Sequence, residues 1–127
     1  MAHQNAVDNN LSAESVVAEY LESGTRIPGF GHRVYTTDPR TQALLRKAEE
    51  LGLKNEHVNF ALELEAELEK QKGKKLCLNV DGMIASLLSA LEITPELGQS
   101  LFLIGRLPGM AYHVDQQKRE KPQSMRK

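Results

Sequence analysis

A loop in the N-terminal third of the chain carries side chains and backbone groups suited to an acidic ligand. Gly29 and Gly31 flank Phe30, and His32 and Arg33 follow at once. Glycine has no Cβ, so its backbone can take a positive φ and lie directly against a ligand. An imidazole titrates near neutral pH, and a guanidinium group binds carboxylates through paired hydrogen bonds. The combination predicts a loop that binds an anion.

The residues after this loop predict a further cation near it. Asp38 followed by Pro39 is typical of a helix start, with the aspartate as N-cap and the proline at the first helical position. Arg40 would then lie in the first turn, where the helix dipole gives a cation no stabilisation. We therefore interpret Arg40 as a residue that meets an anionic ligand.

A carboxylate precedes an apolar segment in the second half of the chain. Asp81 and Gly82 stand before residues 83–91, which are apolar on nearly all sides of a helix, and such a helix is buried centrally. Asp81 has two interpretations. It is an N-cap worth about 1 kcal/mol, or it is a general base whose pKa burial would raise and the helix N-terminus would lower. From the residues alone, the cap is favoured.

Three motifs together resemble those of the citrate synthase family. The first motif is Gly-Phe-Gly-His-Arg-Val-Tyr at residues 29–35, followed by Asp-Pro-Arg at 38–40. The second is Leu-Asn-Val-Asp-Gly at 78–82. The third is Ile-Gly-Arg at 104–106, followed by Gly-Met-Ala-Tyr-His at 109–113. Their order and spacing agree with the family from about Ser12 to the C-terminus. The resemblance implies an all-α fold, the small helical domain of the citrate synthase fold.

The resemblance also implies catalytic and carboxylate-binding roles. Asp81 would take a proton from the acetyl methyl group, and His32 would donate to the carbonyl of oxaloacetate. Arg40 and Arg106 would hold carboxylates of oxaloacetate or citrate. These four side chains are therefore expected to converge on one concave surface.

Coenzyme A is the second ligand that the resemblance implies, as the substrate acetyl-CoA rather than as a bound cofactor. Thr36 stands where many family members carry a basic residue for a CoA phosphate, and Arg33 or Arg46 could compensate. The residues expected to bind CoA are Pro28, Gly29, Phe30, Gly31 and Arg33. No metal site is expected.

The implied activity is that of an acyltransferase of the tricarboxylic acid cycle, which joins acetyl-CoA to oxaloacetate. Gly82 stands where many members of the family have a bulky residue, and this resembles the citryl-CoA lyase module of ATP-citrate lyase, which runs the reverse cleavage. A stand-alone CoA-binding module without catalysis would also carry these motifs, as would a helical interaction domain. The family's enolate-stabilising histidine has no counterpart before His32. We therefore expect a large domain, in cis or in trans, to complete the site, and this chain alone to be inactive.

Composition restricts the class of protein and its partners. The 127 residues are 40% hydrophobic and carry a net charge of −1, which gives no basis for nucleic-acid binding. Cys77 is the single cysteine, so the cytoplasm is the expected compartment, and no apolar run reaches the roughly 20 residues of a membrane span.

The remaining patterns divide the chain into expected segments. Residues 1–11 are expected to be a disordered lead, 12–117 the domain, and 118–127 a basic flexible tail. Alternating glutamates at 63–69 predict a solvated helix face. Helices are expected at about 12–22, 39–51, 56–71, 83–91, 95–104 and 110–117. Two glycines and Pro108 predict a break between the last two of these helices.

Overall fold

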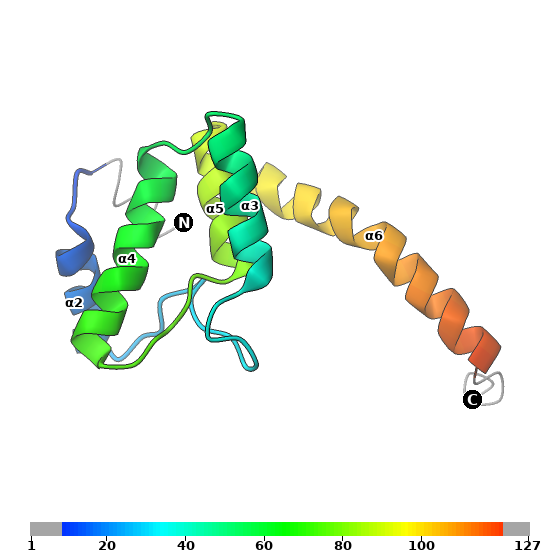
Figure 1. The fold of residues 1–127 in the computed structure, drawn as a ribbon, viewed down its shortest axis with the longest axis horizontal. Coiled ribbons are helices and arrows are strands. Elements are labelled where there is room, and N and C mark those ends of the chain that lie inside the picture. Colours follow the sequence, from blue (N-terminus) through cyan, green and yellow to red (C-terminus); the bar gives the residue numbers. More distant parts are fainter. Residues whose placement is uncertain (1–8, 121–127) are drawn as a thin grey trace. The chain divides into compact units, whose positions relative to one another are not determined.

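Polar side chains define where the first helices of the structure begin. The structure is a computed structural model, and it describes residues 9–120. In each case a side-chain oxygen accepts a hydrogen bond from a backbone amide of the first turn, which stabilises the helix start. The pairs of cap and helix are Ser12 with α2 (Ala13–Glu22), Asp38 with α3 (Pro39–Glu50), Asn55 with α4 (Glu56–Lys72) and Asn79 with α5 (Val80–Ala90) (Figure 1).

The chain divides into two compact units, residues 1–95 and 96–127. In the first unit, α2 packs against α4, α4 against α5, and α5 against α3, and Figure 1 shows these helices in that order. Apolar side chains from all parts of this row form one core. Its fully buried members are Val17, Val58, Leu64, Leu78 and Met83.

The expected all-α fold is confirmed. The helices at 12–22, 39–51 and 56–71 lie within one or two residues of their expected bounds. The segment between α4 and α5 forms an isolated antiparallel bridge with an earlier loop, between Leu78 and Phe30. This bridge holds residues 28–36, the glycine loop, against the segment that leads into α5.

The helix α5 differs from its expectation in its start and in its burial. It begins at Val80, three residues early, because Asn79 and not Asp81 is the N-cap. The cap interpretation of Asp81 is therefore wrong. Leu91 is 47% exposed, and Leu87 is only half-buried. Burial is confined to one face, made by small residues and one methionine, namely Gly82, Met83, Ala85, Ser86 and Ser89.

The break expected at residues 105–108 is wrong. One helix, α6 (Pro95–Glu120), continues through Pro108. Proline removes one backbone hydrogen bond and crowds the carbonyl four residues earlier. The helix-favouring residues on both sides, such as Leu107 and Met110, allow the helix to continue at that local cost. Within residues 9–120, no helix is long and apolar enough to cross a membrane.

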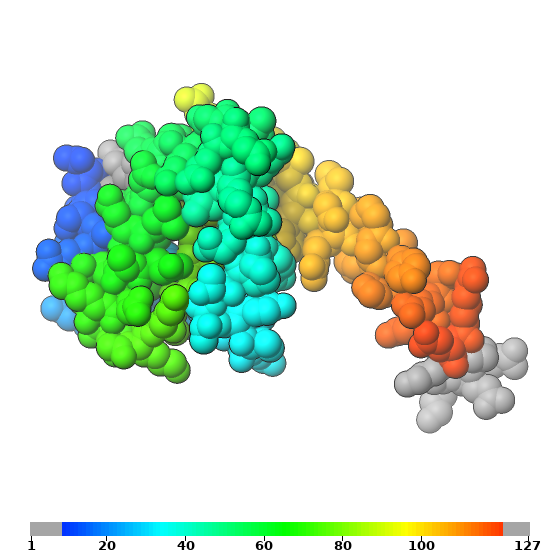
Figure 2. Space-filling model, in the orientation of Figure 1, coloured from blue at the N-terminus to red at the C-terminus, as the bar shows by residue number. Residues whose placement is uncertain are grey.

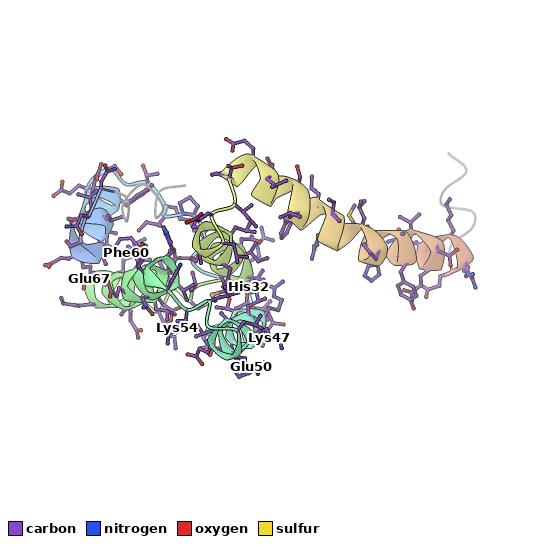
Figure 3. The ribbon with its side chains drawn as sticks, turned by 90° about the horizontal axis from the view of Figure 1, so that it is seen from above. His32, Lys47, Glu50, Lys54, Phe60 and Glu67 are labelled. Atoms are coloured by element: carbon purple, nitrogen blue, oxygen red, sulfur yellow. The ribbon has the colours of Figure 1, made fainter. Side chains whose placement is uncertain are left out.

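The expected terminal segments fall largely outside the described residues. Residues 1–8 of the expected lead and residues 121–127 of the expected tail are not described. Residues 118–120 of the expected tail form the last turn of α6. Figure 3 shows the ribbon with its side chains from above; of the labelled residues, Phe60 is buried in the core, whereas Lys47 and Glu50 lie on the surface.

Candidate functional site

The glycine loop lies directly on the start of α5. Gly29 and Gly31 have φ values of 90° and 86°, which side chains with a Cβ rarely adopt. The amide of Asn79 donates to the carbonyl of Gly29 at 2.9 Å, and the amide of Gly31 donates to the carbonyl of Cys77 at 2.7 Å. In Figure 2 the cyan surface of the loop adjoins the green surface of this segment. The sequence-distant Asp81 is thereby brought to the loop that carries His32.

Gly82 is explained by this close approach. A Cβ at position 82 would lie 2.5 Å from the carbonyl oxygen of Gly29 and 2.7 Å from Cδ1 of Leu78. Backbone atoms cannot move aside as the end of a flexible side chain can. A bulky residue at this position would not fit this loop conformation.

The loop that carries His32 also fixes the orientation of its ring. Its Nδ1 accepts hydrogen bonds from the amides of Val34, at 3.0 Å, and Tyr35, at 3.1 Å. The Tyr35 ring lies against it, with the centroids 4.6 Å apart. An Nδ1 that accepts from amides leaves Nε2 as the protonated nitrogen of the neutral imidazole. His32 is only partly buried, so this Nε2–H can donate to a ligand.

Asp38 joins Arg40 to the start of α5. Its carboxylate accepts from Nε and Nη2 of Arg40 at 3.0 and 2.9 Å, and from the amide of Val80 at 3.0 Å. The paired bonds from Arg40 lower the pKa of Asp38 to about 2, although burial acts to raise it. Asp38 is fully buried, whereas the Arg40 side chain is 47% exposed. The guanidinium is therefore fixed on one edge and open on the other.

Asp81 lies in the first turn of α5 and is exposed. The pKa of Arg40 is raised chiefly by its hydrogen bond to Asp38, and the charges of Tyr35 and Asp81 add to the effect. Asp81 and Tyr35 therefore lie within electrostatic reach of Arg40. The His32 ring lies against the Tyr35 ring, so His32, Arg40 and Asp81 belong to one region of the first unit.

Arg106 belongs to the second unit. It is exposed in the middle of α6, and its guanidinium carbon lies 5.8 Å from the centroid of the Phe102 ring. Its expected convergence with the other three side chains stays a prediction.

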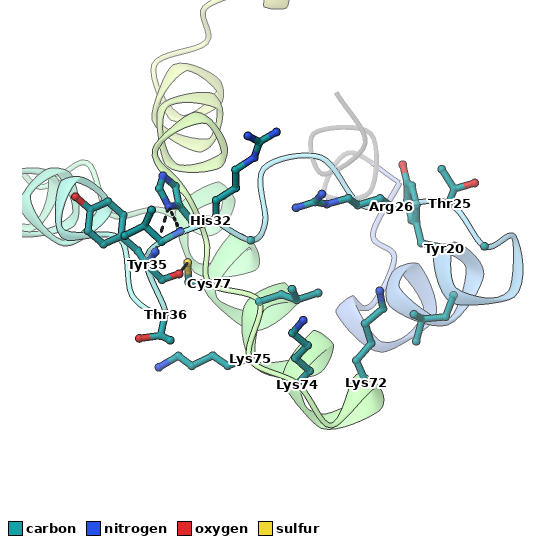
Figure 4. A pocket seen from close by; sticks show the side chains of 16 residues that line it. Tyr20, Thr25, Arg26, His32, Tyr35, Thr36, Lys72, Lys74, Lys75 and Cys77 are labelled. Atoms are coloured by element: carbon teal, nitrogen blue, oxygen red, sulfur yellow. Dashed lines mark hydrogen bonds between the residues drawn. The ribbon is translucent and has the colours of Figure 1, made fainter.

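A cavity of about 690 Å³ lies beside His32 (Figure 4). Its lining comes from the end of α2, the glycine loop, and the segment between α4 and α5. None of the described residues that line it is acidic, and five are cationic: Arg26, Arg33, Lys72, Lys74 and Lys75. The arrangement suits a ligand that carries several negative charges.

Four of these cations were not among the expected binding residues. The lysines at 72–75 follow a glutamate-rich helix and resemble charges that suit a helix C-terminus, and Arg26 belongs to none of the motifs. A signal was present, because the lysines surround Gly73, which ends α4 in the left-handed conformation and turns the chain back toward the loop. Among the five residues expected to bind CoA, Gly31 and Arg33 line the cavity, whereas Pro28 and Gly29 do not. Phe30 does not, because its side chain is 6% exposed and lies in the core.

Two polar side chains support the segment between α4 and α5. Glu65, expected on a solvated face, accepts a hydrogen bond from the amide of Leu78. Thr41 of α3 donates to the carbonyl of Leu78 at 2.9 Å.

Cys77 lines the cavity from this segment, and burial raises the pKa of its thiol. The thiol is therefore a packed group rather than a nucleophile.

Comparison with known proteins identifies the family. The sequence matches the citrate synthase C-terminal domain over residues 1–127. The chain belongs to the citrate synthase family. Among curated relatives, the putative citrate synthase 2 of Mycobacterium bovis is 36% identical over 117 residues, which cover 89% of this chain and 31% of that protein.

Two solved structures share the fold of this chain. The citryl-CoA lyase of Hydrogenobacter thermophilus aligns with a TM-score of 0.85 and 46% identity, over 89% of this chain and 44% of that one. The ATP citrate lyase of Methanothrix soehngenii, solved in complex with citrate and coenzyme A, aligns with a TM-score of 0.77 and 30% identity, over 93% of this chain and 22% of that one. The chain spans less than half the length of each of these relatives.

Proposed function

We propose that the chain supplies the CoA-binding and carboxylate-binding part of a citrate synthase-type active site. The observation that carries the proposal is the cationic cavity that opens beside His32. CoA carries phosphate groups, and lysines and arginines bind phosphates through charge-assisted hydrogen bonds. A CoA seated there would have its phosphates near the lysines at 72–75 and its thiol end directed to the loop.

The side chains near the start of α5 fit the chemistry of the carbon–carbon bond. Asp81 would remove a proton from the methyl group of the acetyl thioester, and the resulting enolate carbon would attack the ketone carbon of oxaloacetate. His32 would donate its Nε2–H to the ketone oxygen as negative charge moves onto it. Arg40 would bind a carboxylate with the edge of its guanidinium that Asp38 does not occupy.

A large domain, joined in cis or supplied in trans, is part of this proposal. An acetyl C–H is a very weak acid, so its removal also needs a donor to the forming enolate oxygen. The roles proposed above already use Arg40, Asp81 and His32, so we assign the hydrogen-bond donor to the enolate oxygen to the large domain. The chain by itself would then bind ligands without turning them over.

The test is a calorimetric titration of the chain with CoA and with 3′-dephospho-CoA. We expect CoA to bind more tightly than 3′-dephospho-CoA. The double variant Lys74→Gln/Lys75→Gln should weaken CoA binding about tenfold, since this needs about 1.4 kcal/mol and two exposed charge pairs contribute up to about 1 kcal/mol each. The matched control is Lys47→Gln/Lys54→Gln, whose lysines pair with Glu50 and Glu49 on the surface. Equal loss in both double variants, or no binding of CoA to the wild type, would contradict the proposal.

Citryl-CoA cleavage is the second candidate, favoured by Gly82 and by the 46% identity to a citryl-CoA lyase. In the reverse direction the hydroxyl proton would pass to water as the carbon–carbon bond breaks, and Nε2–H of His32 would bond to the oxygen that becomes the ketone. Protonated Asp81 would return a proton to the acetyl carbon. The assembled enzyme separates the two directions when it is given citryl-CoA. Hydrolysis to citrate releases a free thiol, whereas cleavage gives acetyl-CoA and oxaloacetate without one.

A further inference from the structure

The side chain of Asn79 is bonded to two separate parts of the site. Its Oδ1 accepts from the amides of Asp81 and Gly82, both at 3.1 Å, so it caps α5. Its Nδ2 donates to the carbonyl of Gly31 at 3.0 Å, so it also holds the glycine loop. One planar amide therefore spans from the residue before His32 to the turn that carries Asp81.

The donor half of this amide is not needed for capping. Serine and aspartate cap helices as well as asparagine does, since capping uses only a side-chain oxygen. Both would lose the bond from Nδ2 to Gly31. The capping role thus leaves the presence of an amide at this position unexplained.

The loop carbonyls surround Asn79. The carbonyl of Gly29 accepts from the backbone amide of Asn79 at 2.9 Å, and the carbonyl of Gly31 accepts from its side chain. Both glycines have a positive φ and no side chain of their own to anchor the loop. The amide of Val34 beyond it bonds to the ring of His32, so the orientation of that ring depends on how the loop is seated.

We propose that Asn79 is a positioning residue, which fixes His32 relative to Asp81 by joining the glycine loop to the first turn of α5. This inference rests on the proposed function for its consequence in catalysis. The hydrogen bonds of the Asn79 side chain to the glycine loop and to α5 belong to the fold itself, so their effect can be measured without any ligand.

The experiment is hydrogen exchange on the full chain, for the wild type and for Asn79→Ser and Asn79→Asp. Both variants keep a capping oxygen and lack the donor. We expect exchange of the amides of residues 31–35 to become about fivefold faster or more, because local opening sets amide protection, with the amides of residues 81–83 and the thermal midpoint nearly unchanged. Asn59→Ser, an exposed site on α4, is the control and should change neither.

Two results would overturn the inference. Loop amides as protected as in the wild type would show that the Nδ2 bond does not hold the loop. Loss of protection in the loop and in α5 together, in both variants, would show that Asn79 acts only as a cap. A parallel titration with CoA distinguishes failure of the positioning role from failure of the proposed function. If the wild type does not bind CoA but the exchange result is as expected, the proposed function fails and the positioning role stands.

Discussion

At the scale of the residue, Asp38 joins the starts of two helices through one buried carboxylate. It caps α3 through the amide of Arg40, pairs with the guanidinium of Arg40, and accepts from the amide of Val80 at the start of α5. A carboxylate can be fully buried at low cost when it is paired and its oxygens accept several hydrogen bonds. The same residue therefore stabilises the fold and orients Arg40.

Replacing Asp38 should destabilise the first unit. In Asp38→Asn the amide brings a donor against the donors of Arg40 and Val80, and the charge pair is lost. We expect the free energy of unfolding to fall by about 2 kcal/mol, as for loss of a partly buried pair. Urea denaturation measures this. Asp115→Asn removes an exposed pair with Arg119 and should cost less than about 0.5 kcal/mol; equal costs would contradict the role of Asp38.

The pKa of Asp38 predicts how stability depends on pH. The pKa is lowered in the folded protein from 3.8 to about 2, so the ionised carboxylate favours the folded state. This contribution is complete above pH 3.8 and is lost as the pH falls toward 2. It amounts to at most about 2 kcal/mol, since one pKa unit corresponds to about 1.36 kcal/mol.

The measurement is the difference in unfolding free energy between the wild type and Asp38→Asn along a pH series. Subtraction removes the titration of the other carboxylates. The difference should shrink on acidification below about pH 4. A difference that stays constant down to pH 2 would show that the charge of Asp38 is not responsible.

At the scale of the element, the close contact between the glycine loop and α5 depends on Gly82. In Gly82→Ala the new Cβ would meet the Gly29 carbonyl, and one of the two segments must move. We expect a loss of about 1–3 kcal/mol, the usual cost of overpacking, and faster hydrogen exchange in the loop.

Gly105→Ala is the matched control, because it also lies inside a helix and its Cβ would meet nothing within 4 Å. Alanine favours the helix over glycine by up to about 1 kcal/mol, so this variant should raise helicity or leave it unchanged. A Gly82→Ala variant as stable as its wild type would mean that the loop is not seated on α5.

The starts of most elements could be predicted from the sequence, because caps are local. Ser12 and Asp38 defined α2 and α3 directly. The expected start of α5 was wrong because Asn79 and Asp81 are both capable caps, and residue type alone does not show which side-chain oxygen accepts from the amides of the first turn. The continuity of α6 through Pro108 could not be read from a residue type that usually ends a helix.

At the scale of the whole molecule, the candidate site was predicted in its motifs but not in its cationic lining. His32, Arg40 and Asp81 belong to short patterns with a recognisable order. The lysines at 72–75 and Arg26 are far apart in the chain and meet only because α2 and α4 pack together. Apart from Gly73, which ends α4 between them, nothing local distinguishes these lysines from those of an ordinary surface.

The proposed need for a large domain predicts that the chain alone is inactive. With acetyl-CoA and oxaloacetate, or with citryl-CoA, it should release thiol and oxaloacetate no faster than a buffer blank, because no donor to the enolate oxygen has been assigned within it. A thiol assay and an oxaloacetate assay measure this. Turnover above the blank that Asp81→Asn abolishes would show that the chain contains a complete site.

The central claim is that the cationic cavity and the start of α5 form two adjoining parts of one substrate site. Nuclear magnetic resonance of the labelled chain tests it most directly, since amide shifts report where each ligand binds. CoA should shift the amides of residues 31–36 and 72–77 together, and citrate added next should shift those of Arg40 and Asp81. Shifts by CoA confined to other surfaces, or shifts by citrate that leave Arg40 and Asp81 unchanged, would contradict the account.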